Sequence, residues 1–158
     1  MIDKLKFIIG VWKGKGLAQF PTIGKTEYIE EIEFKFIGDD ESIAFEQKSW
    51  RVEFGKQAAP LHWESGYIID AGDGVFELFN AQNSRRVEVM TCKELCINED
   101  AASILFESKF FANDEKMVRT TREFVIKDES LHYSMKMSTR NTPEFQEHLN
   151  SRLNRVEV

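Results

Sequence analysis

Residues 31–37 read Glu-Ile-Glu-Phe-Lys-Phe-Ile, a clear alternation of charged and apolar side chains. Ile32, Phe34 and Phe36 fall on one face, and charged side chains fall on the other. A period of two with one apolar face is typical of a half-buried β-strand, because successive side chains on a strand point to opposite sides. The same alternation returns at residues 130–138, so we expect β-structure to recur along the chain.

Similar runs follow one another at regular intervals. The expected strands cover residues 7–19, 31–37, 42–52, 63–69, 75–80, 86–92, 103–111, 117–126, 130–138 and 146–156. Turn-forming Gly, Asp and Asn residues cluster at the breaks between them. The pattern predicts an all-β protein, an antiparallel up-and-down β-barrel of about ten strands like fatty-acid-binding proteins and lipocalins, because closure leaves no exposed edge. A barrel of this size leaves room for a small ligand.

The chain has 158 residues, of which 42% are hydrophobic and 30% charged, and its net charge is −6. No repeat or linker divides it, so we expect residues 1–158 to form a single domain. The acidic balance argues against a nucleic-acid partner, which needs clustered Lys and Arg. No apolar run suits a membrane span or a signal peptide, and Cys92 and Cys96 are expected to be reduced thiols. We therefore expect a cytoplasmic protein without a membrane partner.

Two motifs near the N-terminus each contain a candidate residue: Trp12 in a glycine-rich strand and Thr22 in a turn. Residues 10–16 (G-V-W-K-G-K-G) place Trp12 beside glycines, which predicts a core tryptophan that closes one end of the barrel. Residues 20–24 (F-P-T-I-G) form a turn. Its Thr22 is either a plain turn hydroxyl or a hydrogen-bond partner for a ligand at the barrel mouth.

Two histidines are further candidates. His62, within residues 60–67 (P-L-H-W-E-S-G-Y), either lines a cavity or is a surface histidine held by Glu64. In the last strand, alternation places Leu149 and Leu153 inward and His148 outward.

Other chemistries lack a sequence signal. The two cysteines and three scattered histidines do not have the paired spacing of a zinc site. The chain contains no nucleophile elbow and no phosphate-binding glycine loop. Glu27, Glu30, Glu31 and Glu33 are expected to form a solvated face. The residues alone thus predict a β-barrel with an internal ligand and leave its chemistry open.

In series, these motifs resemble the nitrobindin family, the haem-binding barrel also found at the C-terminus of a THAP-type protein. The family motifs G-x-W-x-G-x-G, [YF]-P-T-I, an acidic pair, P-L-H-x-E-x-G-Y, L-x-Y-x-x-x-M and H-L-x-A-x-L-x-R correspond to residues 10–16, 20–23, 30–31, 60–67, 131–137 and 148–155. The chain departs from the family at Ser151, where Ala is usual, and at a loop expected over residues 49–59. The resemblance spans residues 5–156.

The resemblance implies a barrel that binds haem b at one open end, with His148 as the axial ligand through which the iron acts. The resemblance implies that His148 faces the haem and not the outside, contrary to the alternation. It also implies that Leu149 and Leu153 belong to the outer or interfacial packing of the last strand. Thr22 and His62 would shape the pocket or contact the porphyrin edge. A single protein ligand leaves the sixth position of the iron open. The implied activities are reversible binding of nitric oxide and isomerisation of peroxynitrite to nitrate at ferric haem.

Two alternatives stay open. Intracellular ten-stranded barrels commonly carry a fatty acid or another lipophile. Residues 20–25 are too short for the two lid helices of such carriers, and residues 155–158 lack the tyrosine of their carboxylate clamp. A non-catalytic haem or nitric oxide sensor would share the site and differ in turnover. Members of the nitrobindin family are often dimeric, and the sequence leaves a homodimer open.

Overall fold

The computed structural model describes residues 1–39 and 41–156. Within them it contains one 3-10 helix and ten strands: η1 (Ile2–Ile8), β1 (Gly10–Phe20), β2 (Ile23–Ile37), β3 (Ser42–Glu53), β4 (Lys56–Asp70), β5 (Phe76–Gln82), β6 (Val87–Ile97), β7 (Ala102–Ala112), β8 (Met117–Lys127), β9 (Ser130–Thr139) and β10 (Gln146–Arg155). Each expected strand is present. The strand expected from residue 7 begins only at Gly10, because η1 precedes it.

A second difference concerns the loop expected over residues 49–59, which is wrong. β3 and β4 continue through most of this segment and are joined by a tight turn at Phe54 and Gly55. Both turn residues have positive φ, 53° and 73°. This backbone matches the twist of a hairpin, so β4 begins at Lys56, seven residues before its expected start, while β3 ends within one residue of its expected end.

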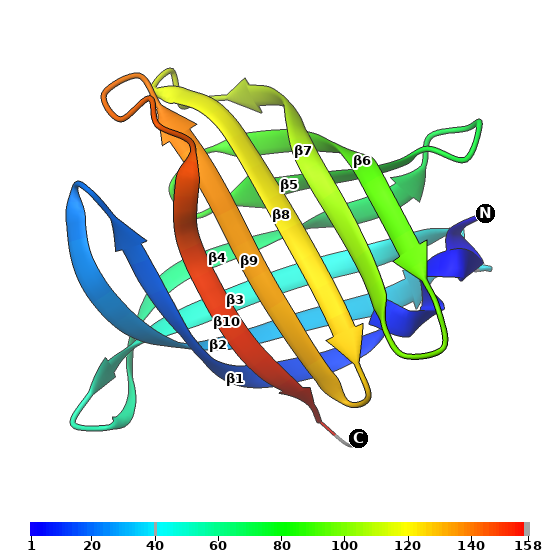
Figure 1. Cartoon of the computed structure of the whole chain (residues 1–158), viewed down its shortest axis with the longest axis horizontal. Coiled ribbons are helices and arrows are strands. Elements are labelled where there is room, and N and C mark those ends of the chain that lie inside the picture. The colour runs from blue at the N-terminus through cyan, green and yellow to red at the C-terminus, as the bar shows by residue number, and fades with distance from the viewer. Residues whose placement is uncertain (40, 157–158) are drawn as a thin grey trace.

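The strands close into one barrel. Each strand pairs antiparallel with the next along the chain, and β1 pairs with β10 to complete the ring (Figure 1). This confirms the predicted antiparallel, up-and-down, ten-stranded β-barrel. Because every strand has two neighbours, the described residues leave no free sheet edge.

One end of the barrel is filled by apolar side chains. η1 lies at this end (Figure 1), and its Leu5 and Ile8 are fully buried. Trp12 is also fully buried, and its Nε1–H donates to the carbonyl oxygen of Ile8 at 2.9 Å. The guanidinium of Arg155 stacks over the Trp12 ring at 4.1 Å from the ring centre. The expectation that Trp12 closes one end is confirmed.

Two glycines of β1 make close approaches possible. A Cβ on Gly14 would lie 2.1 Å from the carbonyl oxygen of Arg152 on β10. A Cβ on Gly16 would lie 2.4 Å from the ring of Tyr28. The first glycine therefore lets β1 and β10 pack tightly, and the second leaves space for an aromatic ring inside the barrel.

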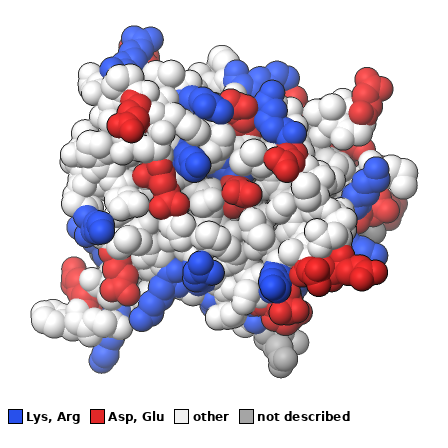
Figure 2. Space-filling model, in the orientation of Figure 1, with Lys and Arg blue, Asp and Glu red and all other residues white. Residues whose placement is uncertain are grey.

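Charges of both signs are interspersed over the outer surface seen in Figure 2, without a large basic area on that face. This agrees with a sequence in which 21 Lys and Arg residues are set against 27 Asp and Glu residues, a net charge of −6. Among the described residues, no helix combines the length and the apolar character needed to cross a membrane.

Candidate functional site

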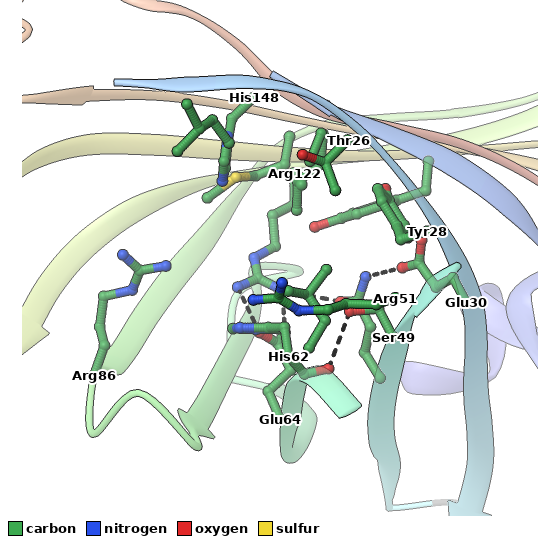
Figure 3. Close-up of a pocket in the computed structure, with 17 residues that line it drawn as sticks. Thr26, Tyr28, Glu30, Ser49, Arg51, His62, Glu64, Arg86, Arg122 and His148 are labelled. Carbon is green, nitrogen blue, oxygen red and sulfur yellow. Dashed lines mark hydrogen bonds and ion pairs between the residues drawn. The ribbon is translucent and has the colours of Figure 1, made fainter. Parts of the chain in front are cut away.

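A cavity of about 370 Å³ lies toward the barrel end opposite η1, where β1 ends and β10 begins (Figure 3). Apolar side chains, including those of Met135 and Leu149, line part of its wall. Charged and polar side chains line the rest, and several of them are almost completely buried. The cavity therefore combines an apolar surface with a set of fixed charges.

His148 lines this cavity and is oriented by the backbone. Its Nδ1–H donates to the carbonyl oxygen of Gln19 at 3.0 Å. Because a carbonyl oxygen only accepts, the proton sits on Nδ1 and Nε2 keeps its lone pair. The ring of Phe20 packs edge-on against the imidazole, with 5.6 Å between ring centres. Burial lowers the pKa of His148, and the charge of Arg86 lowers it further, so the ring is neutral at neutral pH and suited to bind a metal.

A β-bulge explains why simple alternation misplaces His148. The register of β10 on β9 shifts between Glu147 and Leu149, which leaves His148 as the extra residue. An extra residue interrupts the alternation of side chains, so His148 and Leu149 both line the cavity. The outward placement of His148 is therefore wrong. The outer packing of the two leucines is also wrong, because Leu153 is buried in the core and Leu149 packs against it.

His62 lines the cavity from β4 and is tied to a buried ionic cluster. Its Nε2 lies 2.7 Å from Oε2 of Glu64. Glu64 in turn accepts hydrogen bonds from both terminal nitrogens of Arg122, with Nη2 at 3.1 Å. Arg122 also donates to Glu88 at 2.9 Å. Both alternatives for His62 hold together, since it lines the cavity and is held by Glu64.

The cluster of Glu64, Glu88 and Arg122 places two carboxylates around one buried guanidinium. Burial raises the pKa of Glu64, but the charge of Arg122 and the hydrogen bond from His62 outweigh this effect and lower it to about 2. Glu88 also accepts a hydrogen bond from the Thr120 hydroxyl at 2.6 Å. A buried ionic group of this kind is stable only while all its partners are present.

Glu30 lies in the same cavity wall without a cation of its own. Its side chain is almost fully buried, the Gln47 amide donates to Oε1, and Oε2 has no partner among the described residues. Burial raises the pKa of Glu30 to about 7. The expected solvated face is therefore wrong for this residue. The alternation that buries Ile32 also buries Glu30, which lies two positions earlier on the same strand.

Arg51 and Arg86 bring positive charge to the cavity (Figure 3). Arg51 extends from β3 and is exposed. Arg86 immediately precedes β6, and its Nη1 lies 3.5 Å from a carboxylate oxygen of Asp114. Both arginines are more exposed than the carboxylates of Glu30 and Glu64. Among the Lys, Arg, Asp and Glu residues that line the cavity, the two least buried are therefore both arginines.

Thr22 lies in the turn between β1 and β2, where it is exposed and not part of the cavity lining. Thr26, further along β2, lines the cavity instead. The structure therefore brings His62 and His148 to one cavity and places Thr22 outside its lining. A contact between Thr22 and a ligand stays a prediction.

The motifs do not point to the buried cluster, although a signal for it exists. Arg122 shares its side of β8 with Phe124, and Glu88 shares its side of β6 with Met90; all four are buried. A charged residue at the same strand parity as apolar core residues points inward. Strand parity would therefore have identified Arg122 and Glu88 as residues that point into the barrel.

His148 is a single candidate metal ligand in the cavity and, in the described part of the chain, is not part of a cluster of metal-binding side chains. Among the described residues, no group of three His, Cys, Asp or Glu side chains could hold a metal ion. A single histidine is the protein ligand that the iron of a haem needs, because the macrocycle supplies the other ligands. Met135 and Leu149 give such a flat ring an apolar surface in the cavity, and Phe20 packs against His148. The residues present thus fit a haem.

Comparisons with known proteins agree with this fit. Residues 1–155 match the family described as the THAP4-like, heme-binding beta-barrel domain. The protein of Arabidopsis thaliana called "Peroxynitrite isomerase Rv2717c" is 38% identical over 155 residues, which cover 98% of this chain and 89% of that protein. "Peroxynitrite isomerase 2" of Mycobacterium marinum is 30% identical over 156 residues, which cover 98% and 94% of the two chains.

A solved structure shares the whole fold. The crystal structure of Rv2717c from M. tuberculosis superimposes with a TM-score of 0.86 at 26% sequence identity, covering 99% of this chain and 97% of the other. The resemblance to the nitrobindins is thereby confirmed. The chain belongs to the family of THAP4-like, haem-binding β-barrel domains, and its cofactor is haem.

Proposed function

We propose that this protein binds haem b through Nε2 of His148, isomerises peroxynitrite to nitrate and binds nitric oxide reversibly at the same iron. The observation that carries the proposal is the hydrogen bond from Nδ1 of His148 to the carbonyl oxygen of Gln19. This bond leaves Nε2 as the free nitrogen of an imidazole that reaches into the cavity (Figure 3). Such a partner fixes the tautomer and the orientation of a metal-binding histidine. Relatives named peroxynitrite isomerase support the activity.

Bound haem supplies the Lewis acid and redox chemistry, and the chain positions groups around it. His148 and His62 lie on different sides of the cavity (Figure 3). Because the Glu64 carboxylate accepts the Nε2 proton of His62, Nδ1 of His62 is the atom that can take up or release a second proton. His62 is thus placed to hold a proton near an anionic ligand in the cavity.

The buried charges argue against the fatty-acid carrier. A carboxylate inside a barrel needs a cation to offset its desolvation. Arg122 is the one buried Lys or Arg among the described residues, and Glu64 and Glu88 already share its charge. Glu30 adds a third acidic group to the same interior. A fatty-acid headgroup that reached this buried interior, deeper than Arg51 and Arg86, would therefore meet three acidic side chains and one cation.

A haem titration followed by absorption spectroscopy tests the ligand. We expect a saturable one-to-one shift of the Soret band for the wild type and its loss in His148→Ala. Added imidazole should restore the shift in His148→Gly. His132→Ala is the matched control, because His132 bonds to Asn150 and is not part of the cavity lining. The same spectrum and affinity in wild type and His148→Ala would refute the assignment of the ligand.

Stopped-flow measurement of peroxynitrite decay tests the activity. The haem-loaded protein should form nitrate faster than free haem at the same concentration. Equal rates, in a protein that still binds nitric oxide reversibly, would contradict the enzyme and favour the non-catalytic sensor.

We also propose that residues 1–158 act as one haem-binding domain. The homodimer, the lack of a nucleic-acid or membrane partner and the cytoplasmic location stay predictions from the sequence. Sedimentation equilibrium of the haem-loaded protein tests the homodimer directly.

A further inference from the structure

Arg86 is a partly buried arginine whose guanidinium has few partners among the described residues. Its side chain is 13% exposed, and its one ion pair among the described residues, with Asp114, is long at 3.5 Å. Its Nε is buried and has no partner in the described part of the chain. A guanidinium has five N–H donors, and leaving buried ones unpaired costs free energy. Within the described residues, the buried Nε–H of Arg86 therefore lacks an acceptor, which a ligand could supply.

The backbone on both sides of Arg86 is fixed by hydrogen bonds. The amide of Gln82 donates to the carbonyl oxygen of Arg86 at 2.9 Å, which closes the hairpin between β5 and β6. The carbonyl oxygen of Arg85 accepts a hydrogen bond from the side chain of Asn113 at 3.2 Å. The backbone of Arg86 is thus fixed, and its side chain lines the cavity. The planar shape of the guanidinium suits a carboxylate, which can accept two parallel hydrogen bonds from it.

Arg51 adds a second positive charge to the same cavity. It lines the wall from β3 and has no ion pair among the described residues. The nearby carboxylate of Glu64 does not offset it, because that carboxylate is bound to Arg122 and His62. In a protein of net charge −6, the cavity mouth is therefore locally attractive to anions.

We propose that Arg86, assisted by Arg51, binds the carboxylates of haem and so selects a tetrapyrrole that carries negatively charged side chains. The proposal rests on the haem function above and adds the residue that recognises the edge of the cofactor. A fatty acid at the cavity mouth would offer the same carboxylate chemistry. The test therefore includes both sources.

The test compares ferric haem with its dimethyl ester, which has the same ring and iron but no carboxylate charge. Titrations of the full chain should show that the wild type prefers haem by about tenfold, the effect of one charge-assisted contact. Arg86→Gln should reduce this preference to near unity while the affinity for the ester changes little. Arg152→Gln, at an exposed position on β10, should keep it. A preference unchanged in Arg86→Gln would overturn the proposal.

A second variant works in the opposite direction. Asp114→Asn removes the acid that pairs with Arg86, so the preference for haem over its ester should rise. No rise would contradict the role of Arg86. Thermal unfolding of each variant checks that the barrel is intact.

Failure of this proposal and failure of the haem function give different results. A wild type that binds neither haem nor the ester would refute the haem function itself. A wild type that binds both equally would refute only the role of Arg86. Equal binding of both, together with palmitate binding that depends on Arg86, would assign the arginine to a lipid carboxylate and likewise overturn the proposal.

Discussion

The two ends of the barrel interior are built from the same alternating strands and filled in opposite ways. At the end covered by η1, Leu5 and Trp12 are completely buried among other apolar side chains. At the cavity end, Glu30, Glu64 and Arg122 are nearly as deeply buried but are polar. Apolar burial stabilises the fold, whereas buried charges cost desolvation that their partners only partly return. The comparison teaches that the first end maintains the barrel and the second is shaped for a ligand.

A single strand shows the transition between the two ends. The inward face of β2 carries Tyr28, Glu30, Ile32 and Phe34 in succession, and all four are buried. The polar pair lies at the cavity, and the apolar pair lies in the main core. Strand parity therefore fixes which residues point inward, and the position along the strand determines whether they contact core or cavity.

The largest effect should come from breaking the buried cluster. Arg122→Met leaves Glu64 and Glu88 without their cation, so we expect the free energy of unfolding to fall by about 4 kcal/mol. Chemical denaturation at neutral pH measures this change. Arg119→Met, at an exposed position on the same strand, is the control and should change stability by less than about 0.5 kcal/mol. Equal losses of unfolding free energy in the two variants would show that Arg122 stabilises the fold no more than an exposed arginine does.

A cavity made at the closed end should have the next largest effect. Leu5→Ala removes a fully buried side chain, and we expect a loss of about 3 kcal/mol in the free energy of unfolding. Haem affinity should not change, because Leu5 does not line the cavity. A large loss of haem affinity in a folded variant would refute the separation of the two ends.

The pH dependence of stability isolates the charge of Glu30. Its folded-state pKa of about 7 lies above the ordinary 4.5, so the folded state holds the proton more tightly. This stabilisation is complete below pH 4.5 and is lost as the pH rises toward 7. Glu30→Gln cannot ionise, so relative to this variant the wild type should lose about 2 kcal/mol between pH 4 and pH 6. Parallel stability curves for the two proteins would contradict a raised pKa.

The smallest effect is expected at Thr22. It is exposed in a turn outside the cavity lining, so Thr22→Ala should change stability by less than about 0.5 kcal/mol. Haem titration of the same variant tests the porphyrin contact that the family resemblance implies. A clear loss of affinity would extend the site beyond the present cavity.

Local pattern was enough to predict the barrel but not all of its site. Alternation and turn composition depend on neighbouring residues, so the strands and the role of Trp12 followed from the sequence. The bulge at His148 arises from how β10 pairs with β9, which no local pattern reveals. The family motif identified this histidine where alternation failed. Glu30 and Arg122 had the correct inward parity, but their charge made them resemble surface residues.

The hydrogen bond that orients His148 also sets when the site can form. His148 lies on the last strand and Gln19 on the first, 129 residues apart. The imidazole is therefore held in place only after β10 has docked on β1, a contact of long sequence separation that forms slowly. A chain still emerging from the ribosome offers free haem no oriented ligand. Under the proposed ligation by His148, haem would therefore be captured only after β10 has closed the barrel on β1.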